Sequence, residues 1–269
     1  MPLLDFVYYP VSAVLWLWHT VFAALLGADS GPAWVLAIVF LVLTLRALLL
    51  RSFFAQARFQ RGLVKLQPEF AEIKRKYPDD AAKQAAELQR VRQEHGVSML
   101  GGCLPMVGQA LVFIGLFHVL RSFQRADTGN YVFSAAQVDS FLGAKFLGAP
   151  LAATLSGAGD ALFTVAVVAV PLMLVAAVAT HFTARFAVAR QLESGVEPTP
   201  QTRIMNTLTL WVFPAGALLA GAIFPVAILL YFLTQNACTF AQQHLIHRRM
   251  NPSTGAMTGG NAESPGPVR

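Results

Sequence analysis

The chain has 269 residues, of which 55% are hydrophobic and only 13% are charged, and its mean hydropathy is +0.54. A soluble globular protein usually contains about 25% charged residues. The composition therefore predicts an integral membrane protein. It excludes a disordered chain, a secreted disulfide scaffold and an ordinary cytosolic domain.

The first apolar run covers residues 6–26 and is rich in Tyr and Trp. A signal peptide needs a basic start, whereas the first thirty-three residues contain no Lys or Arg. The rings of Tyr8, Tyr9, Trp16 and Trp18 are suited to the level of the lipid headgroups. We expect residues 1–32 to form a helix in the outer interface, with a true membrane span as the alternative.

Five later stretches are long and apolar enough to cross a hydrocarbon core, which takes about 20 residues. They are residues 33–50, 99–120, 161–180, 204–223 and 224–240. The last two meet at Phe224-Pro225, where proline interrupts helical hydrogen bonding and predicts a tight turn. The sequence thus predicts an all-α integral membrane protein with five transmembrane helices.

The basic residues in the connections predict the orientation. Residues 51–98 contain ten Lys and Arg, whereas residues 121–160 contain three. Because cytoplasmic loops are enriched in Lys and Arg, we place residues 51–98, 181–203 and 241–269 in the cytoplasm and residues 121–160 outside. The expected protein is a multi-pass membrane protein with its N-terminus outside and its C-terminus inside.

Residues 51–98 show helical patterning of their own. Apolar residues recur at alternating spacings of four and three: Phe59, Leu63, Leu66, Phe70, Ile73 and Tyr77. Pro78 with Asp79 and Asp80 then predicts a break and a second helix start. We expect a cytoplasmic helical hairpin, with a kink at Pro68 or a break there between the hairpin and the continuation of the first span. A solvated charged loop is the alternative.

Several short motifs occur in order from about residue 6 to residue 249. They are Phe6-Val-Tyr-Tyr-Pro-Val-Ser12, Phe40-Leu-Val-Leu-Thr-Leu-Arg46, Leu66-Gln-Pro68, Lys74-Arg-Lys-Tyr77, Gly102-Cys-Leu-Pro-Met106, Phe224-Pro-Val-Ala-Ile-Leu-Leu-Tyr231 and Gln242-Gln243. Together they resemble the YidC/Oxa/Alb membrane-protein insertase family, in the short form of high-GC Gram-positive bacteria. The chain departs from the family pattern at Gln109-Ala110-Leu111, which replaces a Gln-Ile-Pro step, and at Tyr231-Phe232, which replaces Tyr-Trp.

The resemblance implies that the protein moves hydrophobic segments of nascent proteins into the bacterial plasma membrane through a polar groove that is open to the cytoplasm. It also implies that Arg46 is the positive charge of this groove, that no cofactor is needed, and that nascent membrane proteins are the clients. The ribosome and a Sec translocon are further candidate partners.

Arg46 is the only formally charged residue in the five spans. A rise of about 1.5 Å per residue from Trp34, taken at the outer interface, puts its Cα about 18 Å into a core of about 30 Å. A guanidinium at that depth costs at least about 2.5 kcal/mol, so it must reach water or a partner. The alternative is that its side chain snorkels to the cytoplasmic surface.

Other polar or aromatic residues of the spans are candidates for the same groove. Those that we select are Thr44, Gln109, Tyr231, Phe232, Gln235 and Asn236. Thr and Gln side chains also bond backbone carbonyls or hold helices together, so each has a structural alternative.

Enzymatic chemistry lacks the necessary residues. Cys103 and His118 are about 22 Å apart along one helix, and the spans contain no acidic residue. We expect no metal site, no cofactor and no catalytic residue. An anion-conducting transporter or channel that uses Arg46, or a structural helper of a Sec channel, are the alternative functions.

Basic residues outside the spans are candidates for contact with the ribosome or the nascent chain. They are Lys74, Arg75 and Lys76 in the predicted hairpin and Arg248 and Arg249 in the tail. Such residues attract RNA phosphates and anionic lipids without reading a nucleic acid sequence. Residues after about 250 have too little apolar surface to fold, and we expect them to be disordered.

Overall fold

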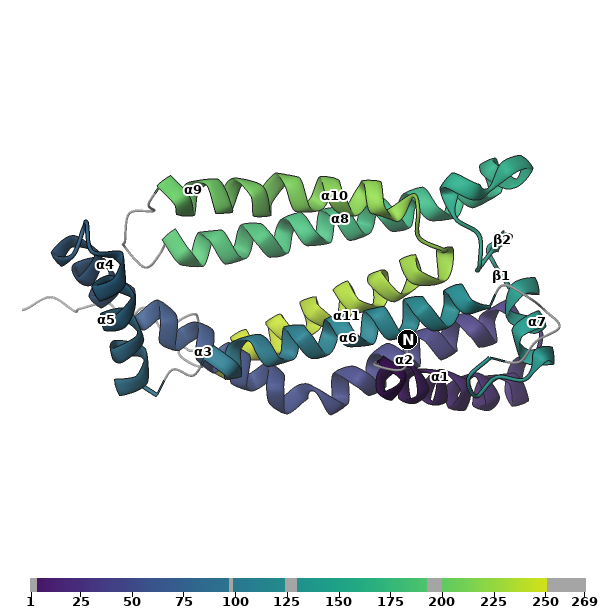
Figure 1. The fold of residues 1–269 in the computed structure, drawn as a ribbon. Helices are drawn as coiled ribbons and strands as arrows, with labels where there is room; N and C mark the ends of the chain where they lie inside the picture. The colour runs from purple at the N-terminus through teal and green to yellow at the C-terminus, as the bar shows by residue number, and fades with distance from the viewer. Residues whose placement is uncertain (1–3, 97–98, 124–129, 193–199, 251–269) are drawn as a thin grey trace, which may run out of the picture.

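The computed structural model describes residues 4–96, 99–123, 130–192 and 200–250 (Figure 1). Helices make up almost all of this part of the chain. Four helical segments are long and apolar enough to span a membrane: Asp5–Leu26, Gly31–Leu48, Gly159–Ala189 and Thr202–Gly221. Two shorter apolar helical stretches are Val107–Ser122 and Val226–Gln242. The predicted all-α membrane fold is confirmed, whereas the number of spans stays a prediction.

Helix α1 (Asp5–Leu26) packs against both α2 (Gly31–Leu48) and α6 (Met99–Ser122). Near its start, the ring of Tyr8 stacks on His118 of α6 with a centroid distance of 4.1 Å. Near its end, the ring of His19 stacks on Trp34 of α2 at 3.7 Å. His118 lies close to the last residue of α6 and Trp34 close to the first of α2. These two contacts join both halves of α1 to the same end of the bundle, while Trp18 reaches Thr44 near the other end of α2. The interfacial location of α1 stays a prediction.

The helical path is interrupted at Leu66, two residues before Pro68. The helices of this segment are α3 (Leu50–Lys65), α4 (Gln67–Lys76) and α5 (Ala81–Glu94). Proline fits the first turn of α4, where its missing N–H has no helical acceptor to lose. Helix α3 packs against α6, while α4 packs against α5. The expected break is thus present. The apolar seam that was predicted to run from Phe59 to Tyr77 is divided between two helices that have different neighbours.

The opposite end of the molecule is built by α7 (Ala135–Gly143), the two-residue strands β1 (Lys145–Phe146) and β2 (Ala149–Pro150), and the short 3-10 helices η2 (Leu155–Gly157) and η3 (Gly159–Ala161). Ser134 and Gln137 form a capping box that starts α7. The fully buried side chains of Trp34 and Phe141 pack edge to face at 5.1 Å. A folded core therefore covers the start of α2.

Helix α8 (Leu162–Leu192) continues beyond residue 180, where hydropathy placed the end of a span. Residues 181–192 are consequently helical, and the loop predicted over residues 181–203 is wrong for this part. Hydropathy shows where a stretch of apolar residues ends, which is not always where the helix ends. Polar residues such as His181 and Arg185 are compatible with a continued helix. Residues 193–199 of the predicted loop lie outside the described part of the chain.

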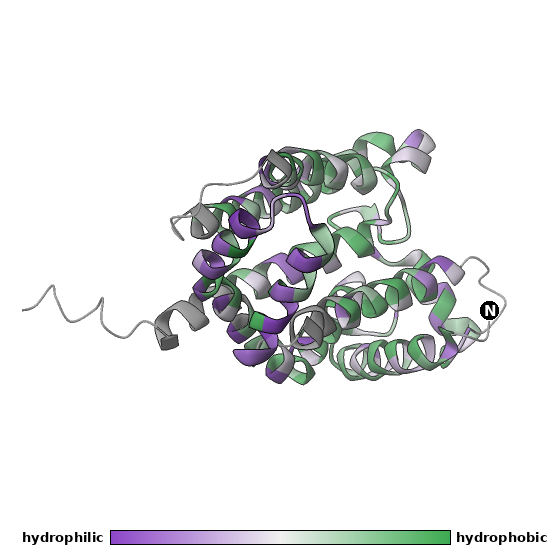
Figure 2. Cartoon of the chain, turned by 60° about the vertical axis from the view of Figure 1, so that its left-hand side comes forward, coloured by the Kyte–Doolittle hydropathy of each residue, from purple (hydrophilic) through white to green (hydrophobic). Residues whose placement is uncertain are grey.

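The next helical segment consists of α9 (Pro200–Thr207), a π-helical turn η4 (Leu208–Val212) and α10 (Phe213–Gly221). Helix α11 (Val226–Met250) follows. The predicted turn at Phe224-Pro225 is confirmed, because α10 ends and α11 begins on either side of it. Helix α10 packs along α8, and α11 packs against α2 and α8. Figure 2 shows that the long helices are largely hydrophobic, while hydrophilic residues gather at the end formed by α4 and α5.

Candidate functional site

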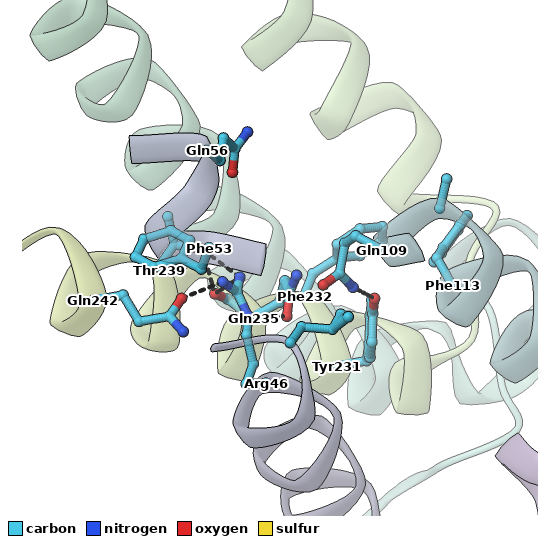
Figure 3. A pocket seen from close by; sticks show the side chains of 12 residues that line it. Arg46, Phe53, Gln56, Gln109, Phe113, Tyr231, Phe232, Gln235, Thr239 and Gln242 are labelled. Carbon is cyan, nitrogen blue, oxygen red and sulfur yellow. Dashed lines mark hydrogen bonds between the residues drawn. The ribbon is translucent and has the colours of Figure 1, made fainter. Parts of the chain in front are cut away.

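A cavity of about 420 Å³ lies where α2, α3, α6 and α11 meet (Figure 3). Its lining residues are Arg46, Leu49, Phe53, Gln56, Gln109, Ala110, Phe113, Tyr231, Phe232, Gln235, Thr239 and Gln242. Hydrocarbon and aromatic groups form most of this wall, and the polar groups are amides, two hydroxyls and one guanidinium. The cavity is therefore a mainly apolar recess that holds a cluster of polar groups and one cation.

Arg46 reaches from α2 to one face of α11. Its Nε donates a hydrogen bond to Gln235 Oε1 at 3.0 Å, and its Nη2 donates to the Gln235 carbonyl at 3.2 Å. Nη2 also donates to Thr239 Oγ1 at 2.6 Å, and Nη1 donates to Gln242 Oε1. All these acceptors are neutral, and no carboxylate of the described residues forms an ion pair with Arg46. The guanidinium is thus held by dipoles and keeps its net charge.

The far side of the cavity is closed by a bond between α6 and α11. Gln109 Nε2 donates to the hydroxyl of Tyr231, whose side chain is almost fully buried. The rings of Phe113 and Phe232 pack beside it with centroids 5.3 Å apart. The polar part of the cavity therefore lies toward Arg46 and Gln242, and an aromatic wall ends it beyond Tyr231 (Figure 3).

The cavity brings together Arg46, Gln109, Tyr231, Phe232 and Gln235 of the residues selected from the sequence. Thr44 does not line it: its hydroxyl accepts a bond from Trp18 Nε1 at 2.9 Å and donates to the Phe40 carbonyl at 2.8 Å. Asn236 also lies outside the lining, and its Nδ2 donates to the Phe232 carbonyl at 2.9 Å. Both side chains thus have the structural roles that were the alternative.

Several lining residues were not predicted from the sequence, among them Phe53, Gln56, Thr239 and Gln242. Thr239 and Gln242 follow Gln235 by four and seven residues, so they share its face of α11. That spacing was the available signal. Gln242 was not predicted because residues after 240 were assigned to the cytoplasmic tail. Thr239 lies within the predicted span of residues 224–240, and its distance of one helical turn from Gln235 was not used.

None of the basic residues selected for contact with other molecules lines this cavity. Lys74, Arg75 and Lys76 are exposed in the last turn of α4. Arg248 and Arg249 belong to the last turn of α11, and their side chains lie outside the described part of the structure. Among the described residues, no group of three or more His, Cys, Asp or Glu is placed to hold a metal ion.

Comparison with known proteins identifies the family. Residues 25–253 match the family described as 60Kd inner membrane protein. The chain belongs to this family. Similar relatives are named membrane protein insertase YidC. One, from Mycolicibacterium paratuberculosis, is 43% identical over 265 residues, which are 90% of this chain and 75% of the relative.

Two further relatives carry the same name. The protein from Mycobacterium tuberculosis is 42% identical, with 90% of this chain and 72% of the relative covered. The protein from Streptomyces avermitilis is 33% identical, with 94% of this chain and 60% of the relative covered. The resemblance to the YidC/Oxa/Alb insertases, and to those of high-GC Gram-positive bacteria, is confirmed. This member of the 60Kd inner membrane protein family is a multi-pass membrane protein, and the names of its relatives support an insertase function.

Proposed function

We propose that this protein inserts hydrophobic segments of nascent membrane proteins into the bacterial plasma membrane, and that a polar part of the client enters the cavity beside Arg46. One observation carries the proposal. In an otherwise apolar bundle, a guanidinium lines a cavity of about 420 Å³ and has only neutral partners among the described residues.

A client carboxylate would gain from this arrangement. A carboxylate adds the attraction of its negative charge and can accept two parallel hydrogen bonds from one guanidinium, whereas the present acceptors of Arg46 are neutral. An acidic client residue can therefore displace Thr239 or Gln242 from Arg46, and the released hydroxyl or amide can turn to water or to the client backbone. The polar lining lowers the cost of moving a polar segment part of the way across the membrane.

The hydrophobic client helix would supply most of the driving free energy. Burial of apolar surface in lipid contributes about 25 cal/mol per Å². Outward movement of an acidic tail is favoured by a membrane potential that is negative inside, and it contributes about 2.3 kcal/mol per charge per 100 mV. No cofactor is required in this scheme.

The orientation and the partners follow from charge. We place α4, α5 and the end of α11 in the cytoplasm, because residues 51–98 contain ten Lys and Arg against three in residues 121–160. Lys74, Arg75 and Lys76 would then face the ribosome or anionic lipids, together with Arg248 and Arg249. A Sec translocon is a further partner that this orientation permits.

Crosslinking of a ribosome-bound client tests the proposal. A photoreactive amino acid would replace Phe232 in the cavity or, as the control, Trp211, which is exposed on η4. A single-span client with an acidic tail should crosslink mainly at position 232, and Arg46→Ala should weaken that crosslink. Equal crosslinking at both positions, unaffected by Arg46→Ala, would favour non-specific contact through lipid.

A further inference from the structure

A second cavity, of about 330 Å³, lies at the C-terminal end of α6. It is lined by Phe117, Leu120, Arg121, Phe123, Phe141, Ala152, Thr154, Ser156, Ile223 and Pro225. The wall is formed by α6, α7, the segment after β2 and the turn before α11. In the orientation proposed above, this cavity opens at the outer surface.

Arg121 is the one cationic side chain of this wall. Its guanidinium carbon lies 5.8 Å from the centre of the Phe117 ring. No carboxylate in the described ranges lies within 4.0 Å of it. Thr154 and Ser156, which carry hydroxyl groups, also line this cavity. A cation beside hydroxyls and aromatic rings is suited to an oxyanion carried on an apolar chain.

The two cavities follow the same face of α6. Gln109 and Phe113 line the Arg46 cavity, whereas Phe117 and Arg121 line the second cavity. These four residues recur at intervals of four, so they form one stripe that extends about 18 Å along the helix. The chain around residues 223–232 supplies a second wall to both cavities.

Aromatic rings separate the cavities. Phe224, in the turn before α11, contacts Phe113 at 5.9 Å and Phe117 at 5.6 Å between ring centroids. Phe113 and Phe117 stack on each other at 6.1 Å. A chain that passes from one cavity to the other along α6 must displace these rings, and they keep the two polar regions apart when no chain is present.

We propose that the second cavity is an outer receiving site for a carboxylate of the client segment that has passed Arg46, with Arg121 as its cation. The inference rests on the proposed function. A client segment is favoured over a lipid phosphate because the stripe on α6 and the shared second wall connect this cavity with the Arg46 cavity. Binding at Arg121 would retain an acidic tail at the outer side and oppose its return.

The test uses the full chain in vesicles of phosphatidylglycerol and phosphatidylethanolamine. A photoreactive amino acid replaces Ile223, which lines the cavity and is 64% exposed. Two ribosome-bound single-span clients differ only in the tail, which carries Asp in one and Asn in the other. The acidic tail should crosslink about two to five times more than the neutral tail, the range expected for one solvent-exposed ion pair.

Arg121→Gln should lower the crosslink of the acidic tail to the level of the neutral tail. Lys145→Gln is the matched control, because Lys145 is an exposed cation at the same end of the protein but outside the cavity. It should leave both crosslinks unchanged. The two tails can also be compared on the protein that retains Arg121. This comparison tests the receiving site even if Arg121→Gln accumulates poorly.

Equal crosslinking of the acidic and neutral tails would overturn the receiving site, as would label found on lipid instead of the client. These outcomes are distinct from failure of the proposed function. If Arg46→Ala blocks insertion and Arg121→Gln changes nothing, only the outer site is wrong. If Arg46→Ala inserts the acidic client normally, the role proposed for Arg46 is wrong, and if the unmodified protein inserts neither client, the proposed function is wrong.

Discussion

Arg46 of α2 and Gln235 of α11 are joined by two hydrogen bonds, one from Nε to the side-chain oxygen at 3.0 Å and one from Nη2 to the backbone carbonyl at 3.2 Å. The backbone carbonyl that Arg46 bonds also accepts a bond from Thr239 Oγ1 at 2.9 Å. One cation thus fixes the position of α2 relative to a polar face of α11. The same contact shapes the cavity and holds its charge.

The hydrogen bond between Gln109 and Tyr231 should contribute to stability independently of Arg46. Tyr231→Phe removes the hydroxyl that accepts from Gln109 and retains the ring. The loss should be about 1 kcal/mol, which lowers the Tm by about 2–4 °C for a chain of this size. Thermal unfolding of the purified protein in detergent would measure it.

Tyr9→Phe is the control, because Tyr9 is 52% exposed and contacts Tyr131 through its ring. It should leave the Tm nearly unchanged. Equal shifts in the two variants would mean that the bond to Gln109 contributes nothing particular.

Much of the cavity could be predicted from the sequence because depth along a span follows from residue number. Arg46, Gln109 and Gln235 were selected in this way, and all three line the cavity. Depth does not give direction around the helix axis. Thr44 has the right depth but points to Trp18 of α1, a contact that no local pattern of α2 reveals.

Long-range packing explains the other differences. Trp34, whose depth at the outer interface stays a prediction, is buried within the protein, and its Nε1 donates to Ser140 Oγ at 3.0 Å. The two residues are 106 positions apart, so their pairing depends on the fold of α7. Likewise, α11 continues through Gln242 because packing on α2 extends beyond the apolar stretch that hydropathy detects.

Gly31 should be intolerant of any side chain. A Cβ at this position would lie 1.8 Å from the carbonyl oxygen of Lys145, and backbone cannot move aside as a flexible side chain can. Gly31→Ala should destabilise the protein by about 1–3 kcal/mol, as overpacking does in other cores. Gly143→Ala, at a position where a Cβ meets nothing within 4 Å, should have little effect. Unfolding in detergent would compare the two, and equal stability would show that α2 and β1 do not approach so closely.

The pair of helices α4 and α5 should loosen when a charge is introduced between them. Phe70 of α4 packs under Arg92 of α5, with 5.6 Å between the guanidinium carbon and the ring centre. Phe70→Asp removes the ring from between the two helices and puts a hydrated carboxylate in its place, and trypsin should then cleave within residues 67–94 several times faster. Glu72→Gln, on an exposed residue of the same helix, should leave the rate unchanged. An unaltered cleavage pattern in Phe70→Asp would contradict the packing of α4 on α5.

Asp80 should make the start of α5 sensitive to acid. Hydrogen bonds from Lys83, the backbone N–H first, lower the pKa of the Asp80 carboxyl below its ordinary value. The stabilisation is therefore complete above the ordinary pKa, about 3.9, and is lost as the pH falls through the lowered value. Hydrogen exchange of residues 81–84 should quicken in that range. Asp80→Asn retains an acceptor without a titrating group, and it should show no such acid step; an identical step would assign the effect to another group.

Insertion measured with matched clients tests the role of Arg46 most directly. The protein, Arg46→Lys and Arg46→Ala would each be reconstituted in vesicles at equal amounts of folded protein. Two single-span clients would be compared, one with an acidic and one with a neutral tail, and translocation would be scored by protease protection of the tail. The account predicts that Arg46→Ala loses most insertion of the acidic client, roughly tenfold or more for a charge-assisted bond of about 1.5–3 kcal/mol, while Arg46→Lys retains a large part of it. Full insertion of the acidic client by Arg46→Ala would contradict the account and would leave Arg46 as a residue that only joins α2 to α11.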